Sequence, residues 1–294
     1  MPISASAVGA KLSPIQTEMT TRRLLAFAAG IGDTSPIVFD DLDARFCAAP
    51  QICVSLEWAS VVANNPGAAV GATPEESLRG VHAVQDSVFH RPVRPGETLT
   101  TEGEIIGLWS GRSGTNMATR FTHIAEDGAA VFTSYMQSTF RGVALEGEAR
   151  PTEDRPTVPS PSDTASAQVE ERVAVPVSLP HVFSECAELW NPIHTERAVA
   201  RAAGLPDVIL HGVATWSMAG RAILARYADG DVTRLRRLRG RMSAMIVPGA
   251  PVKLHSQQDR VGDTVRVFYS VENAEGAVAI REGYAEIDGG LDAR

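Results

Sequence analysis

Cysteine is scarce in this sequence. Three residues, Cys47, Cys53 and Cys186, are spread over 294 positions without paired spacing. Such a pattern excludes a disulfide framework and fits a reducing compartment, so we expect a cytoplasmic protein. The histidines and cysteines also lack the spacing of a metal site, and we expect neither a metal nor a cofactor.

Long apolar runs and an excess of positive charge are missing as well. No stretch of 18 or more apolar residues occurs, so the sequence predicts no membrane-spanning helix. Asp and Glu outnumber Lys and Arg by 35 to 27, and the net charge of -8 argues against nucleic acid as a partner. The length of 294 residues allows two domains, each with its own core.

The chain contains an internal repeat. Residues 33–38 read Asp-Thr-Ser-Pro-Ile-Val, and residues 189–194 read Leu-Trp-Asn-Pro-Ile-His, 156 positions later. Pro50 and Pro206 are separated by the same 156 positions. The first hexapeptide has an acid and no histidine, whereas the second has a histidine and no acid. Both halves therefore derive from one module, and such repeats decide the architecture.

Two turns repeat in the same order. Pro-Gly occurs at 95–96 and at 248–249, an offset of 153. An acidic residue followed by glycine occurs at 127–128 and at 275–276, an offset of 148. The offset shrinks along the chain, as expected when loops differ in length between copies.

The sequence of each half predicts one long helix followed by four strands. This order indicates an α+β architecture in which an antiparallel sheet wraps around the helix. The proline-rich segment 147–171 reads as a linker between an N-terminal domain, 1–146, and a C-terminal domain, 172–294. The expected helices cover 21–31, 53–63, 182–189 and 213–226. The expected strands cover 87–93, 99–108, 116–123, 130–141, 235–245, 251–259, 264–272 and 277–287.

The second half resembles the MaoC-like hydratase/dehydratase family. The resemblance lies in Asn-Pro-Ile-His at 191–194, Gly-Leu-Pro at 204–206 and His-Gly at 211–212. The first half resembles the degenerate N-terminal copy of double hot-dog members, through 28–33 and 90–99. The resemblance implies two tandem hot-dog domains that form a pseudo-dimer, each with an antiparallel sheet around a long central helix.

The resemblance also implies a chemistry, the addition of water to an enoyl thioester or its removal from a 3-hydroxyacyl thioester. That reaction needs a base for water and donors for the thioester oxygen. His194 is the expected acid/base, and Asn191 is expected to hold water or orient His194. Gly212 is the expected oxyanion donor through its N–H at a helix start. A capping or turn-forming role is the alternative for His194 and Asn191.

Leu189 stands where the family has its catalytic Asp. Glu185 lies one helical turn earlier, on the same face if the segment is helical, and is the expected substitute acid. Glu188 would point about 100° away on a regular helix. A solvated helix glutamate is the alternative interpretation of Glu185.

Three more residues are candidates for substrate binding. His211 is expected to support the turn before the central helix. Arg237 and Arg239 belong to a run of arginines that suits a coenzyme A phosphate, although a charged strand edge is the alternative. In the first half, an offset of 156 sets Ser55 against His211 and Leu56 against Gly212, so we expect no second active site there.

Together these features favour a hydro-lyase that acts on an acyl-CoA or acyl carrier protein thioester. The alternatives are a non-catalytic thioester-binding hot-dog and a hot-dog thioesterase. A homodimer of double hot-dog chains is a possible assembly.

Overall fold

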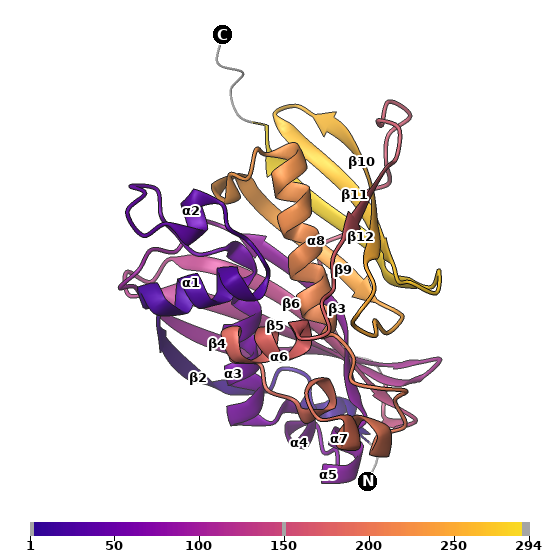
Figure 1. Cartoon of the computed structure of the whole chain (residues 1–294). Coiled ribbons are helices and arrows are strands. Elements are labelled where there is room, and N and C mark those ends of the chain that lie inside the picture. The colour runs from indigo at the N-terminus through magenta and orange to yellow at the C-terminus, as the bar shows by residue number, and fades with distance from the viewer. Residues whose placement is uncertain (1–2, 149–150, 290–294) are drawn as a thin grey trace.

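The computed structural model describes residues 3–148 and 151–289, and its centre is one ten-stranded antiparallel sheet (Figure 1). The strand order is β2-β4-β5-β6-β3-β9-β12-β11-β10-β8, and β1 pairs with β7 in a separate two-stranded sheet. The strands are β1 Ile3–Ser4, β2 Lys11–Glu18, β3 Gly80–Phe89, β4 Thr98–Gly111, β5 Gly114–Ala125, β6 Ala130–Arg141, β7 Leu145–Glu146, β8 Val169–Val173, β9 Leu235–Met242, β10 Val252–Val261, β11 Thr264–Glu272 and β12 Val278–Asp288. The α-helices are α1 Thr21–Gly30, α2 Pro36–Phe39, α3 Cys53–Asn64, α4 Pro66–Ala69, α5 Pro74–Ser77, α6 Leu179–Cys186, α7 Arg197–Ala202 and α8 Gly212–Tyr227. The 3-10 turns are η1 Ala5–Ala7, η2 Pro50–Ile52, η3 Pro192–His194 and η4 Val232–Arg234.

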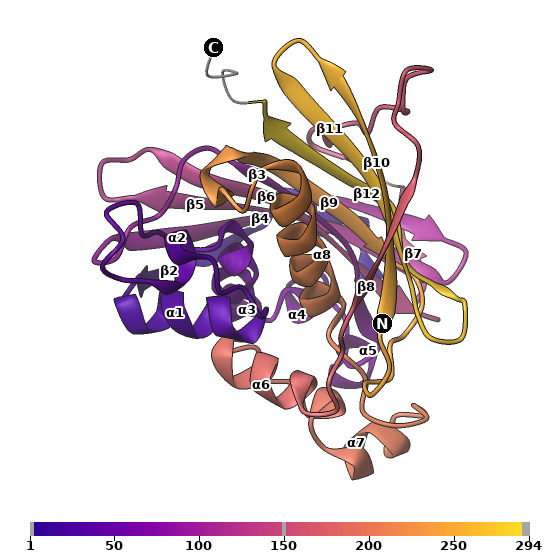
Figure 2. The ribbon, with the colours of Figure 1, turned by 45° about the horizontal axis from the view of Figure 1, so that its top comes forward.

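The two halves meet where β3 pairs with β9, with Asp86 opposite Arg239. On either side of this junction the same order of elements recurs, and α3 and α8 lie against the same face of the sheet (Figure 2). This arrangement confirms the expected α+β pseudo-dimer.

Alternation of side chains explains the strands. Along β11 the residues at 265, 267, 269 and 271 are buried and their neighbours are half-buried, as the period of two in a strand requires. The sequence prediction of β6 and β11 agrees with the structure residue for residue. The strand expected at 87–93 instead covers Gly80–Phe89, because its earlier residues pair with both β6 and β9.

Small residues let α8 lie close to the sheet. A Cβ at Gly220 would stand 2.5 Å from Leu238 Cδ2 and 2.7 Å from Gln51 Nε2. Eleven residues of this helix are buried. The absence of a side chain at Gly220 therefore permits close packing of α8.

The repeat is visible in matching backbone hydrogen bonds. Asp33 N–H donates to Ala28 O, and Leu189 N–H donates to Ser184 O, both at 2.9 Å and 156 positions apart. The Asp-Gly and Glu-Gly turns also match, because Gly128 and Gly276 adopt φ values of 82° and 80°. The two halves thus share the backbone hydrogen bond at the start of the hexapeptides and the backbone conformation of the later turn.

The segment between the halves is extended. Residues 147–148 and 151–168 contain no helix or strand, as expected of a linker, but β8 begins at Val169 within the expected linker range. Among the residues that the structure describes, no helix is long and apolar enough to cross a membrane.

Candidate active site

His194 and His211 come together at the start of the central helix of the second half. Their rings are stacked, with centroids 3.6 Å apart and planes 26° apart. Asn191 caps the turn that carries His194, since its side chain accepts from the Ile193 N–H at 3.4 Å. Nδ1 of His194 donates to the Ile209 carbonyl at 2.8 Å. This bond leaves the Nε2 lone pair of His194 for chemistry.

Burial keeps both imidazoles uncharged at neutral pH. Desolvation lowers the pKa of His194, and the hydrogen bond to Ile209 O opposes that shift in part. Desolvation lowers the pKa of His211 to about 3, with a further contribution from His194. The site therefore offers a neutral base at physiological pH.

His211 is the residue before α8 and is 1% exposed. Its Nε2 lies 3.2 Å from the Leu189 carbonyl oxygen and 3.2 Å from Ser184 Oγ. The ring thus joins the end of α6 to the beginning of α8. It lies at the turn before the central helix, where the sequence placed it.

Gly212 is the first residue of α8, where an N–H has no acceptor within the helix. The N-terminus of a helix also carries partial positive charge. A Cβ at Gly212 would stand 2.7 Å from Met242 Cγ, so a larger residue would require that side chain to move. Gly212 can donate to an anionic oxygen at this position.

The structure corrects the residue that corresponds to Gly212 in the first half. Ala48 N–H donates to Val93 O and Leu210 N–H donates to Ile246 O, which sets the local offset at 162. Ala49 therefore corresponds to His211, and both have extended backbones before the next element.

Pro50, not Leu56, corresponds to Gly212, because six extra residues precede α8, so the 156-residue spacing of Pro50 and Pro206 is not a structural match. Ser55 likewise does not correspond to His211. Proline has no N–H, so the first half lacks the donor as well as the histidine.

Leu189 is buried, and its carbonyl oxygen faces His211. The expectation that Glu185 shares a helical face with it is wrong. α6 ends at Cys186, and Glu188 takes a left-handed backbone with φ of 52°, so the chain turns before Leu189. Glu185 is exposed, and Glu188 forms an ion pair with Arg23 at 2.9 Å.

The structure separates Arg237 and Arg239 from this site. Leu238 faces α8, so its neighbours on β9 point to the opposite face of the sheet. Arg237 is 6% exposed and donates to both carboxylate oxygens of Asp86 at 2.8 Å. Arg239 donates to the Glu282 carbonyl and carboxylate. Their guanidinium groups hold protein groups together on the face away from His194.

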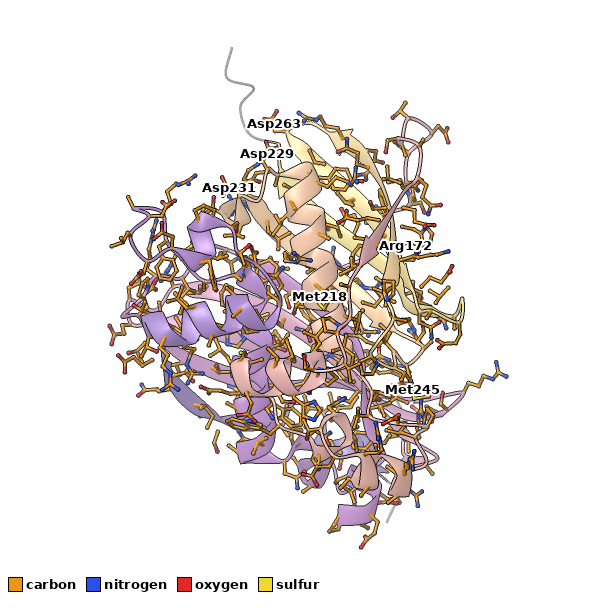
Figure 3. The ribbon with its side chains drawn as sticks, viewed as in Figure 1. Arg172, Met218, Asp229, Asp231, Met245 and Asp263 are labelled. Carbon is orange, nitrogen blue, oxygen red and sulfur yellow. The ribbon has the colours of Figure 1, made fainter. Side chains whose placement is uncertain are left out.

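An apolar pocket lies beside the first turns of α8. Thr215, Met218 and Ala219 of the helix line it, and Figure 3 shows Met218 midway along α8. The remaining lining residues come from the β8 region, the segment before α8 and the sheet: Val173, Val175, Leu210, Val252, Leu254 and Val271. The surface that lines this pocket is apolar.

The sequence did not predict two buried polar groups, one around Ser184 and one around Glu57. Ser184 is fully buried, and a polar residue on the buried face of α6 was its only signal. Glu57 is buried on α3, where Gln85 Nε2 donates to both its carboxylate oxygens and His123 Nε2 lies 3.7 Å away. Glu57, Gln85 and His123 belong to the first half, which has no counterpart of His194 or of the Gly212 N–H. Within the described residues, no group of three or more His, Cys, Asp or Glu side chains could hold a metal.

Both halves of the chain match known protein families. The family description "MaoC like domain" matches residues 187–277, and "FAS1-like, dehydratase domain region" matches residues 6–134. A Dictyostelium discoideum protein named "Probable enoyl-CoA hydratase 2" is 21% identical over 95% of this chain and 94% of its own length.

Solved structures show the same fold. A MaoC-like dehydratase from Phytophthora capsici is 24% identical, with a TM-score of 0.81 over 97% of each chain. A Mycobacterium tuberculosis protein described as a double hot-dog fold is 15% identical, with a TM-score of 0.62 over 96% of each chain. Residues 187–277 therefore match a MaoC-like domain and residues 6–134 a dehydratase domain region, and the chain has the double hot-dog fold.

Proposed function

We propose that the chain adds water to an enoyl thioester, or removes it from a 3-hydroxyacyl thioester, at the site in its second half. One observation carries this proposal. The His194 ring stacks on His211, the residue directly before Gly212, so a neutral imidazole and a helix-terminal N–H belong to one site. A base beside an oxyanion donor is what hydration of a conjugated thioester requires.

The reaction can be balanced with these two groups. Nε2 of His194 takes a proton from water as the water oxygen bonds to C3. The electron pair of the C2–C3 double bond moves toward the thioester oxygen, where the Gly212 N–H stabilises the developing charge. The imidazolium then returns its proton to C2 on the same face, and the thioester carbonyl forms again. Dehydration is the reverse sequence.

The apolar pocket supports an acyl substrate. Its lining includes Leu210, two residues before Gly212, and Thr215, one helical turn after it. A thioester oxygen at the Gly212 N–H would thus have its hydrocarbon chain beside α8. The name of the Dictyostelium relative, "Probable enoyl-CoA hydratase 2", supports the same reaction class. The proposed substrate is an acyl-CoA or acyl carrier protein thioester.

We infer that His194 works without the carboxylate that Leu189 replaces. The sequence proposed Glu185 as a substitute, but its side chain is exposed at the end of α6 and, among the described residues, forms no hydrogen bond or ion pair with His194 or His211. A single imidazole that both receives and returns the proton needs no second acid. Glu185→Gln separates the two proposals.

The decisive assay uses the purified full chain with crotonyl-CoA and a longer trans-2-enoyl-CoA. Double-bond absorbance and free thiol are followed together. Loss of absorbance without thiol release supports hydration. Thiol release would instead indicate a thioesterase, and binding without either change would indicate a non-catalytic thioester-binding protein.

A further inference from the structure

We propose that His211 is a positioning residue, held in place by Ser184 and by the Leu189 carbonyl. Its ring keeps the stacked His194 ring at the start of α8 and shields the His194 ring from water. This inference rests on the proposed role of His194 in hydration. It assigns a function to two buried side chains, Ser184 and His211, that need not touch the substrate.

The hydrogen bonds fix the tautomer of His211. A carbonyl oxygen can only accept, so Nε2 of His211 carries the proton when it bonds Leu189 O at 3.2 Å. Nδ1 is then an unprotonated nitrogen, and it is buried without a hydrogen-bond partner among the described residues. A proton added there would be a buried, unpaired donor, which is costly. His211 is thereby kept neutral.

A neutral His211 is what the stacked arrangement requires. At a centroid separation of 3.6 Å, two charged rings would repel each other. Because His211 stays neutral, His194 can accept a proton during the reaction. The His211 ring also covers one face of His194, and this desolvation favours the uncharged base before the reaction begins.

The other titratable groups on the surrounding segments are engaged elsewhere or exposed, except Cys186 and Arg241, which are half-buried. His181 Nε2 bonds the Thr195 carbonyl, and its exposed position leaves it outside the stack. Ion pairs join Glu188 to Arg23 and Arg197 to Asp207. The remaining groups on α6, α7, the segment before α7 and the end of β9 are Glu185, Cys186, Glu196, Arg201 and Arg241. His211 is therefore the titratable group in direct ring contact with His194.

Ser184 contacts both Leu189 and His211. Its carbonyl accepts from Leu189 N–H at 2.9 Å, and its hydroxyl lies 3.2 Å from His211 Nε2. The first half keeps the backbone bond through Ala28 and Asp33 but has no hydroxyl and no ring at the corresponding positions. The side chains of Ser184 and His211 are thus confined to the half that carries His194.

The test is a pH titration of the His194 ring by NMR in the full-length protein, without substrate. His211→Asn removes the covering ring, and we expect the pKa of His194 to rise toward its ordinary value of about 6.5. His211→Phe restores an aromatic face, and we expect it to keep the pKa of His194 low. Ser184→Ala should shift the pKa of His194 upward by less than His211→Asn does. His255→Asn, on β10, is the matched control and should leave the titration unchanged.

A kinetic profile provides the second readout. If crotonyl-CoA is hydrated, the acid limb of kcat/KM should move to higher pH in His211→Asn and stay in place in His211→Phe. An unchanged His194 titration in His211→Asn and Ser184→Ala would overturn the proposal. If His211→Asn does not fold, the milder Ser184→Ala carries the same test. The NMR result needs no turnover, so a failed hydration assay would overturn the proposed reaction without deciding the positioning role.

Discussion

Asp86 and Arg237 form a buried ion pair across the junction of the two halves. Both guanidinium–carboxylate contacts are 2.8 Å long, and the side chains are 5% and 7% exposed. Arg237 also donates to the carbonyls of Pro156 and Thr157. One side chain therefore connects β3, β9 and the segment between the halves.

Arg237→Met tests this structural role against a phosphate-binding role. Removing one partner of a buried pair leaves a buried charge, which costs about 3–5 kcal/mol of unfolding free energy. Urea unfolding should show that loss, whereas KM for an enoyl-CoA should stay the same in the folded variant. Unchanged stability with a raised KM would instead support the coenzyme A contact expected from the sequence. Arg260→Met, on the exposed end of β10, is the control.

Gly212→Pro gives the second half the residue that stands at the equivalent position of the first half. Proline suits the first position of a helix, and His211 already has the extended backbone that precedes a proline. The variant loses the N–H, and we expect the turnover rate to fall about 100- to 1,000-fold. Gly212→Ala meets the same Met242 side chain but keeps the N–H, so it should retain much more activity. Equal losses in both variants would show that crowding, not the donor, matters.

Glu185→Gln examines the proposed absence of a carboxylate partner. The exposed side chain is expected to contribute nothing to proton transfer, so kcat and KM should match those of the unaltered chain. Glu196→Gln is a matched exposed control from the following segment. If Glu185→Gln alone slowed turnover by about 100-fold or more, Glu185 would be restored as the substitute acid.

Acid should destabilise the protein through His211. Its pKa is about 3 in the folded protein and about 6.5 in an unfolded chain, so the unfolded state binds the extra proton between these values. Stability therefore decreases as pH falls below about 6.5, by roughly 3 kcal/mol at pH 4 from this residue. The difference between the unaltered chain and His211→Phe, measured by urea unfolding at each pH, isolates the contribution. Parallel curves for the two proteins would contradict it.

Much of the fold could be predicted from local patterns. β-branched and aromatic residues between turn signals located β6 and β11, and the matched hexapeptides located the repeat, because both signals involve neighbouring residues. The ion pair of Arg237 could not be found in this way. Its partner Asp86 lies 151 positions away, and only the pairing of β3 with β9 brings them together.

The relative placement of the candidate residues could be predicted where a short motif determines the local backbone, and could not be predicted where the length of a loop differs between the halves. His194 and Gly212 follow from short motifs, and the structure brings their segments together. Leu56 was matched to Gly212 because the 156-residue offset was assumed to hold, although extra residues before α8 raise it to 162. Glu185 was placed beside Leu189 because nothing in the sequence showed that α6 ends at Cys186.

The central claim is that His194 performs acid/base chemistry on an enoyl thioester. The most direct measurement is the initial rate of crotonyl-CoA absorbance loss for the unaltered chain, His194→Ala and the control His255→Ala, with free thiol followed in parallel. We expect hydration by the unaltered chain and by His255→Ala, no thiol release, and a rate about 100- to 10,000-fold lower in His194→Ala. Full activity in a folded His194→Ala variant would contradict the claim.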